Sequence, residues 1–353
     1  MADLLHFSPQ AESMRSREID KNDFFKQKAS FEKIKFLLRY AVLAPSTHNS
    51  QPWLFKVEKN SCKIYSNPEK NITEADPLGR DLHISFGCLI ENLIVAADYF
   101  SIFSHLEYFG GREDYLIAEV FFQNLDAPPK VKPELEKILD AIPKRVNARG
   151  IFEKKSISQE IVQKIVSKND FSDLRIDIVQ QPEKIDALAR LTAEGLKMAY
   201  SHTSFRKEMS SWMNSSFSRR KEGIPGYSLR MPPLVSLVLP TLMRLFNMSR
   251  RVAFLNYQSI SSAPVVCVIS AEKNSPAIWL MVGRLFERIA LTIGPSGLKA
   301  SIFVASVEMG DLYKDVQKIL DHERIPQFLF CLGYMDFNQA PNMRHQVESK
   351  IIS

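Results

Sequence analysis

The chain has 353 residues, of which 45% are hydrophobic and 24% charged. This composition is typical of a globular protein with enough apolar material for one large domain or two moderate ones. The net charge of +6 comes from 46 dispersed basic residues without a helix-turn-helix, zinc or RNP pattern, so nucleic-acid binding is not expected. The four cysteines lie far apart, and no metal-ligand spacing is present, which predicts reduced core cysteines and no metal site.

The beginning of the sequence lacks a basic stretch followed by an apolar core, so we expect no signal peptide and a cytoplasmic protein. The longest apolar stretch, residues 231–243, is too short to cross a bilayer, and prolines interrupt it. The longer stretch 231–248 could lie on a membrane surface, but a flap over a pocket or a core segment is the favoured interpretation. We therefore expect no membrane span, and a monomer or a homodimer.

Residues 1–20 are polar and aperiodic, which predicts a loose arm. Beyond them, apolar periodicity predicts alternating helices and strands over most of the chain. The expected helices are 31–43, 82–99, 131–141, 161–168, 182–200, 277–293 and 311–320. The expected strands are 54–57, 63–65, 104–108, 116–122, 175–179, 265–269, 301–305 and 328–332. Residues 202–254, rich in Arg, Met, Pro and Phe, show no regular pattern.

Two pairs of segments indicate a diverged internal repeat, with chance similarity as the alternative. SQPWLFKV at 50–57 matches SAPVVCVI at 262–269, and GCLIE at 87–91 matches GRLFE at 283–287. The repeat predicts two similar halves in one chain. The expected boundaries are an arm at 1–30, a first half at 31–142, a second half at 143–345 with an insertion at 202–254, and a tail at 346–353.

The sequence APSTHNSQPW at 44–53 connects a predicted helix to a predicted strand. It is longer than such a connection needs, and its Ser, His, Asn and Gln side chains offer several hydrogen-bonding groups to a ligand held beside it. This pattern is typical of a cofactor site. The alternative is a structural turn in which Trp53 fills the core.

The sequence RVNAR at 145–149 alternates two arginines with an asparagine. In an extended segment Arg145, Asn147 and Arg149 project from one face, which suits the binding of an anion and of polar groups. A solvated basic linker is the alternative, and spacing alone favours it. No Ser/His/Asp, Cys/His or phosphate-loop pattern is present, so no catalytic side chain is predicted.

Together these motifs resemble the nitroreductase-like FMN flavoproteins, and more narrowly their Acg-type branch, in which one chain holds both halves of the usual dimer. The resemblance spans residues 31–345 and includes DPLGRDL at 76–82 and RVNARGIF at 145–152. Its second-half pieces are EGIPGYSL at 222–229, SAPVVCVIS at 262–270, SVEMGDL at 306–312 and PQFLFCLGY at 326–334. It implies an α+β fold, with a mixed sheet flanked by helices and two similar halves forming an intrachain pseudo-dimer.

The resemblance also implies one non-covalently held FMN, which itself supplies the hydride chemistry. The implied contacts are Arg145 and Arg344 at the phosphate or ribityl end, Asn147 and Arg149 at the ribityl hydroxyls and pyrimidine edge, Pro45, Ser46, His48 and Asn49 along the isoalloxazine ring, and the backbone of Ser306, Val307 and Glu308 near flavin N5.

The chain departs from the family pattern in three places. Asn147 stands where Thr or Ser is frequent, Cys331 stands where Arg is frequent, and the first half lacks its own RxSxR-like motif. The implied function is an FMN-dependent oxidoreductase that passes hydride from NAD(P)H to a quinone, nitroaromatic or similar small acceptor. The alternatives are a flavin-sequestering protein with little turnover, whose flavin residues 202–254 cover as a lid, and a flavin-free structural protein.

Overall fold

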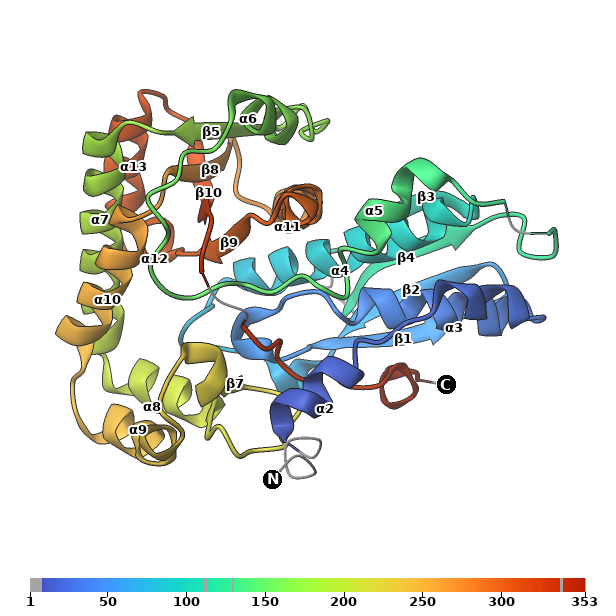
Figure 1. Ribbon diagram of the computed structural model, residues 1–353, viewed down its shortest axis with the longest axis horizontal. Coiled ribbons are helices and arrows are strands. Elements are labelled where there is room, and N and C mark those ends of the chain that lie inside the picture. Colours follow the sequence, from blue (N-terminus) through green and yellow to red (C-terminus); the bar gives the residue numbers. More distant parts are fainter. Residues whose placement is uncertain (1–7, 111–113, 129, 337–338, 353) are drawn as a thin grey trace.

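The computed structural model describes residues 8–110, 114–128, 130–336 and 339–352, and Figure 1 shows them as two α+β halves. The first half contains α3 (Ser30–Ala41), β1 (Trp53–Val57), β2 (Ser61–Ser66), α4 (Arg80–Tyr99), β3 (Phe103–Tyr108), β4 (Leu116–Phe122) and α5 (Glu136–Leu139). The second half contains α6 (Gln159–Val166), β5 (Leu174–Val179), α7 (Pro182–Ser201), α10 (Ser249–Ser261), β8 (Val265–Ala271), α11 (Pro276–Ile293), β9 (Lys299–Ile302), α12 (Ala305–Glu308), α13 (Leu312–Leu320) and β10 (Ile325–Gly333).

The two halves have the same sheet topology. The first sheet has the order β1-β2-β4-β3 and the second the order β5-β8-β10-β9, with antiparallel neighbours throughout. Parallel bridges from Ile351 to Phe55 and from Asn147 to Ala300 extend the two sheets and make them mixed. The predicted α+β pseudo-dimer is therefore confirmed.

The topology corrects one part of the predicted repeat. Strand β8 is second in its sheet, as β2 is in the first, so β1 corresponds to β5. The match between 50–57 and 262–269 is therefore wrong, because the Pro-led start of a strand recurs at two different places in the fold. The match between the helices is confirmed, since α4 and α11 hold the same place in each half and pack against each other at the junction (Figure 1).

The contact between α4 and α11 depends on two facing glycines. A Cβ on Gly87 would lie 2.1 Å from the carbonyl oxygen of Leu280, and one on Gly283 would lie 2.0 Å from that of Ile84. The backbones can approach this closely only because neither residue has a side chain. Helix α4 is long and apolar enough to cross a membrane, but 83% of its apolar window is buried, as in the core helix of a globular protein.

The main core spans both halves, and the second sheet is buried on both faces. Alternate residues of β8 and β10 face α11 on one side and α7, α10 and α13 on the other. This double burial explains the continuous apolar sequence of β8. All four cysteines are buried and free, as predicted.

Two regions differ from the sequence-based prediction. Part of the predicted loose arm, whose residues 1–7 lie outside the described residues, is ordered. It forms α2 (Pro9–Arg15), which Ser8 caps through the amide of Ala11 at 3.2 Å, and a turn of 3-10 helix at Lys21–Lys26. The predicted helix 131–141 is reduced to a 3-10 turn at Pro133–Leu135 and the short α5.

Residues 202–254, called the lid segment below, are largely helical. They contain α8 (Thr203–Trp212), a two-stranded parallel ladder of β6 (Met213–Asn214) and β7 (Ile224–Pro225), a 3-10 turn at Gly226–Leu229, and α9 (Pro233–Leu245). A small core of its own includes Met213, Leu239 and Met243 and joins the lid segment to Tyr200 at the end of α7. In Figure 1 this segment forms the lower left of the molecule, below α7 and α10.

Candidate cofactor site

Two adjoining chambers lie where the loop 44–53, the RVNAR segment and the lid segment meet. The apolar chamber has a volume of about 250 Å³, and the cationic chamber one of about 180 Å³. Together they fall in the range of roughly 300–1,000 Å³ usual for small-ligand sites. The residues that line both chambers are Pro45, Ser46, His48, Asn147, Arg149 and Met209.

The loop 44–53 is held in a strained conformation at the boundary of the chambers. His48, Asn49 and Gln51 all have positive φ angles, of 52°, 57° and 49°. Such residues cost of order 1–3 kcal/mol each and persist only where surrounding contacts fix them. Here the Asn49 amide donates to the carbonyls of Lys221 (2.9 Å) and Met343 (3.3 Å), and the Gln51 N–H donates to Ser46 Oγ (3.0 Å). The loop is therefore set in place by contacts within the protein.

Neutral polar groups are set into the walls of the apolar chamber. Burial, with Arg149 adding to it, lowers the pKa of His48 to about 4, so this imidazole is neutral at pH 7. Its Nε2 atom is buried and has no hydrogen-bond partner in the part of the chain that the structure describes. Burial raises the pKa of Tyr200 to about 12, so the phenol keeps its proton. Leu196, Phe205 and Phe303 supply apolar surface between these groups.

A pair of carboxyl groups forms another part of this wall. Asp81 and Glu308 line the apolar chamber and lie close enough for each carboxyl group to influence the pKa of the other. Arg80 pairs with Glu308 at 2.9 Å and donates to the carbonyl of Val307 at 3.1 Å. Burial raises the pKa of both carboxyl groups. Two carboxyls beside one guanidinium carry one negative charge in excess, which a single shared proton would neutralise.

The cationic chamber holds three buried guanidinium groups against one carboxylate. Arg17, Arg145 and Arg344 are 5%, 8% and 7% exposed, and the fully buried Glu287 lies 2.8 Å from Arg145 Nε. Burial and the neighbouring arginines lower the pKa of Arg17 well below its usual range and that of Arg344 to about 9. Buried charges of one sign require a counter-charge, so this chamber has the electrostatics of an anion site.

Backbone carbonyls hold the three arginines in position. Arg145 Nη2 donates to the carbonyl of Leu43 and Arg344 Nη2 to that of Ala44, each at 3.0 Å, just beyond the C-terminal end of α3, where cations are favoured. Arg17 Nη1 donates to the carbonyl of Arg145 at 2.8 Å. The Nε atoms of Arg17 and Arg344 are buried and have no hydrogen-bond partner among the described residues.

Most of the predicted site residues converge on these chambers. Those that line them are Pro45, Ser46, His48, Asn49, Arg145, Asn147, Arg149, Glu308 and Arg344. Ser306 and Val307 do not: Ser306 is fully buried and accepts a hydrogen bond from Thr192 at 3.1 Å, and Val307 packs in the core. Sequence reasoning missed Arg17, because no motif or apolar period marks its surroundings.

The lid segment covers both chambers. Phe205 and Met209 of α8 line the apolar chamber, and Ile224 and Leu229 line the cationic chamber, whereas α9 lines neither. Of the lid segment, α8 and the turn at 224–229 therefore line the chambers, and α9 packs against them from outside, while the role of the segment as a lid stays a prediction.

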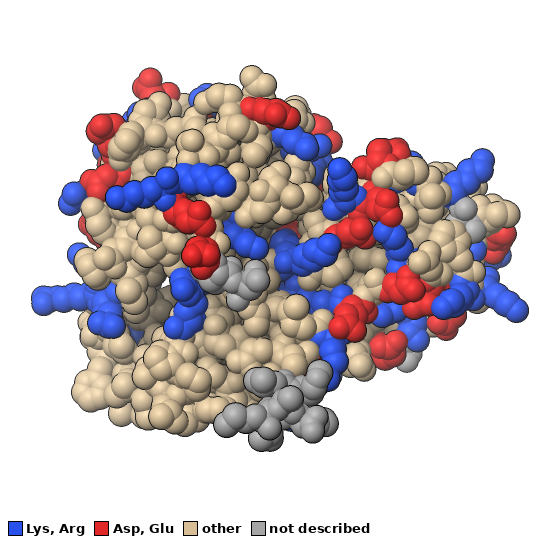
Figure 2. Space-filling view, viewed as in Figure 1, with Lys and Arg blue, Asp and Glu red and all other residues tan. Residues whose placement is uncertain are grey.

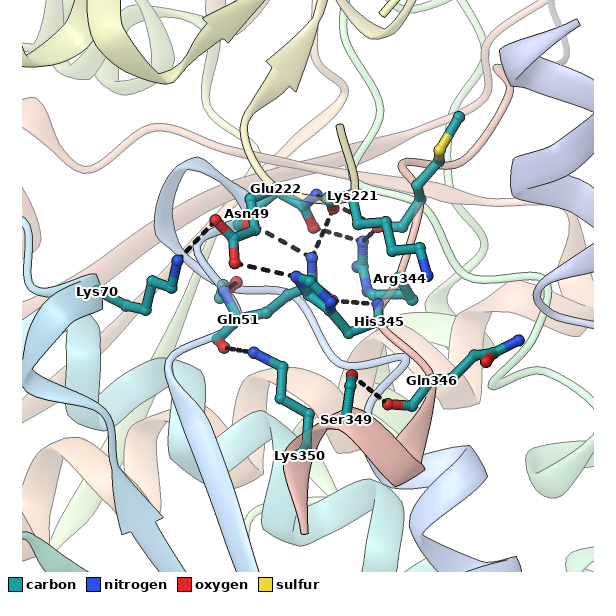
Figure 3. Close-up of polar contacts among 12 residues, drawn as sticks. Asn49, Gln51, Lys70, Lys221, Glu222, Arg344, His345, Gln346, Ser349 and Lys350 are labelled. Carbon is teal, nitrogen blue, oxygen red and sulfur yellow. Dashed lines mark hydrogen bonds and ion pairs between the residues drawn. The ribbon is translucent and has the colours of Figure 1, made fainter. Parts of the chain in front are cut away.

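A polar cluster, called the latch below, ties the lid segment to the rest of the protein (Figure 3). The carbonyl of Lys221 accepts from the amides of Asn49 (2.9 Å) and Gln51 (2.6 Å). The Glu222 carboxylate pairs with Lys70 and with His345, each at 2.9 Å, which lowers its pKa despite its burial. The latch therefore joins three stretches that are far apart in the sequence.

The fold and the cavity define an α+β protein of two similar halves. Its single chain encloses two adjoining chambers, one apolar and one cationic. No family model matches the chain. It is 26% identical over 317 residues to the "Putative NAD(P)H nitroreductase acg" of Mycobacterium tuberculosis H37Rv, covering 87% of this chain and 91% of the relative. It is 20% identical over 312 residues to "Putative NAD(P)H nitroreductase Rv3131" of the same organism, covering 88% and 87%. These relatives confirm the resemblance to Acg-type, nitroreductase-like proteins.

The solved structures to which the chain is similar match about three fifths of its length. A nitroreductase with bound FMN from Desulfitobacterium hafniense is 16% identical, with a TM-score of 0.40, and covers 62% of this chain and 98% of its own. The FMN- and NADPH-dependent nitroreductase NfnB from a sphigopyxis species is also 16% identical, with a TM-score of 0.42 and coverages of 61% and 98%. The fold assignment given above depends on the sheet topology of this chain rather than on these structures.

Proposed function

We propose that the chain binds one FMN non-covalently and acts as an NAD(P)H-dependent oxidoreductase on a small acceptor. The observation that carries this proposal is the pairing of the two chambers. One holds three buried arginines against a single carboxylate, and the other joins apolar walls with neutral polar groups. A phosphate ester on a polar chain attached to a flat ring has the complementary chemistry. The names of the relatives support this assignment.

Arg17, Arg145 and Arg344, which line the cationic chamber, would hold the phosphate. Asn147 and Arg149, at the boundary of the chambers, would contact the ribityl chain and the pyrimidine edge. When bound, the flavin supplies hydride transfer between NAD(P)H and the acceptor. The residues of the chain bind it, orient it and exclude water.

The carboxyl pair has a role of its own in this proposal. A quinone or nitro group that receives a hydride also takes up a proton. A proton shared by Asp81 and Glu308, whose pKa values burial raises, would lie at the wall of the apolar chamber, where an acceptor would bind. His48 is neutral there and adds no positive charge beside the ring.

The first test is the absorption spectrum of the purified protein, followed by titration of the apoprotein with FMN. We expect a flavin spectrum and one FMN per chain. A protein that takes up no FMN refutes the proposal, and a stoichiometry near two refutes the single-site assignment. Anaerobic mixing with NADH or NADPH then measures the reduction of the flavin.

A second candidate function is flavin sequestration without turnover, favoured by the lid segment and its latch. Glu222→Gln removes the ion pair with Lys70 and alters the hydrogen bond with His345, whereas Glu272→Gln removes an exposed pair with Arg324 on the surface. If the lid gates access, the Glu222 variant keeps FMN and is reduced faster by NAD(P)H, while the Glu272 variant behaves as wild type. Rapid reduction of the wild-type protein would eliminate sequestration.

A further inference from the structure

The outer side of the lid segment exposes a continuous apolar surface. Only Ser236, Leu239 and Met243 of α9 are buried. The large apolar residues exposed on and beside the helix are Leu234, Val235, Leu237, Val238, Leu242, Leu245 and Phe246, together with Phe254 and Leu255 of α10. We call this surface the α9 face. Single exposed apolar residues are ordinary, but a run of this kind marks an interaction site.

The charge around the α9 face has one sign. Residues 223–271 contain no Asp or Glu, whereas Arg244, Arg250 and Arg251 are exposed on α9 and α10. Figure 2 shows the corner of the molecule over α8 and α9 without acidic side chains in that view. An apolar helix face bordered by arginines is the composition of a helix that lies in the headgroup region of an anionic membrane.

We propose that the α9 face docks on the surface of an anionic lipid bilayer, with α9 lying in the membrane plane. At 13 residues the helix is too short to cross a bilayer. Its exposed leucines and valines can enter the acyl boundary while Arg244, Arg250 and Arg251 contact lipid phosphates.

A second copy of the chain is a poorer occupant of this surface. A two-fold symmetric contact sets the same patch against itself, which would bring these arginines together. The segment has no carboxylate to separate them, and like charges in an interface oppose association. Nucleic acid is also a poor occupant, because the centre of the face is apolar and no basic groove lies there.

The test is co-sedimentation of the holoprotein with vesicles of phosphatidylcholine containing about 30% phosphatidylglycerol. The test variant is Val235→Glu/Arg244→Glu on α9. The matched control is Val166→Glu/Lys164→Glu on α6, which lies at the opposite end of the molecule in Figure 1. Val235 and Val166 are 44% and 45% exposed, and both double variants change the net charge equally.

We expect the wild type and the α6 variant to bind these vesicles and the α9 variant to bind at least about tenfold more weakly. Binding should fall with about 0.5 M NaCl and be weak on phosphatidylcholine alone. Absence of binding to the anionic vesicles, or equal losses in the two variants, overturns the proposal. The proposal is also overturned if sedimentation velocity shows that the wild type and the α6 variant are dimers and the α9 variant is a monomer. The α9 face would then be an interface between copies of the chain.

Discussion

Replacing Arg17 by Gln tests the cationic chamber most directly. Arg17 is 5% exposed, its Nε atom has no partner, and Arg145 and Arg344 lie close enough to lower its pKa. A desolvated, charge-assisted contact with a phosphate contributes roughly 1.5–3 kcal/mol, so Arg17→Gln should weaken FMN binding by about 10- to 150-fold. Riboflavin, which lacks the phosphate, should bind the variant and the wild type with similar affinity.

The assay is titration of the apoprotein with FMN and, separately, with riboflavin. Fluorescence quenching or calorimetry measures the binding. Arg15→Gln is the matched control, because Arg15 is exposed on the same short segment. The FMN-free Arg17 variant should unfold at the same or a higher temperature than wild type, since a buried like charge has been removed. Unchanged FMN affinity, or an equal loss for riboflavin, would show that Arg17 does not contact the phosphate.

Three further predictions follow from the same structure. Arg145→Ala should weaken FMN binding by at least about tenfold, whereas Arg39→Ala, outside both chambers, should leave it unchanged in the same titration. The pKa of His48 is about 4 in the folded chain and 6.5 in the unfolded chain. The contribution of the neutral imidazole to the free energy of unfolding is therefore complete above pH 6.5 and is lost as the pH falls toward 4. In the His48→Gln variant, the free energy of unfolding should fall by up to about 3 kcal/mol less between pH 6.5 and pH 4 than in the wild type. Denaturant unfolding of the apoprotein measures this difference. An equal fall in both proteins would contradict the burial of a neutral imidazole. Gly87→Ala should destabilise the fold by about 3 kcal/mol or more, because its Cβ would overlap the Leu280 carbonyl, whereas Gly294→Ala meets nothing closer than 3.8 Å and should be tolerated.

The sequence predicted the regular elements well where burial imposes a period on them. Helices α4, α7 and α11 and strands β4, β8 and β10 all lie within a few residues of their predicted positions. The lid segment was not assigned because α9 exposes apolar residues on most of its circumference and contains Pro240, so it lacks the usual stripe. Helix α2 was missed for the opposite reason, since PQAESMR carries almost no apolar residue.

The candidate site was predictable where its residues are adjacent in sequence. The loop 44–53 and the RVNAR segment each bring several ligand-facing groups in one motif. Arg17 and Glu287 could not be found in this way, because each joins the cluster only through tertiary packing. Glu287 lies in α11 between Arg284 and Arg288, and only the structure shows that it pairs with Arg145.

The crossing of residues 344–352 to the first half has a consequence for synthesis. Arg344 donates to the carbonyl of Ala44, Lys350 to that of Gln51 and the Ile352 N–H to that of Phe55, at 3.0, 2.9 and 2.8 Å. At about 5–20 residues per second, the ribosome adds these residues roughly 15–60 s after their partners. During that interval β1 is an unprotected sheet edge, open to pairing with other chains. The three arginines of the cationic chamber come together only after Arg344 has been made, so under the proposed function FMN would bind only after that point.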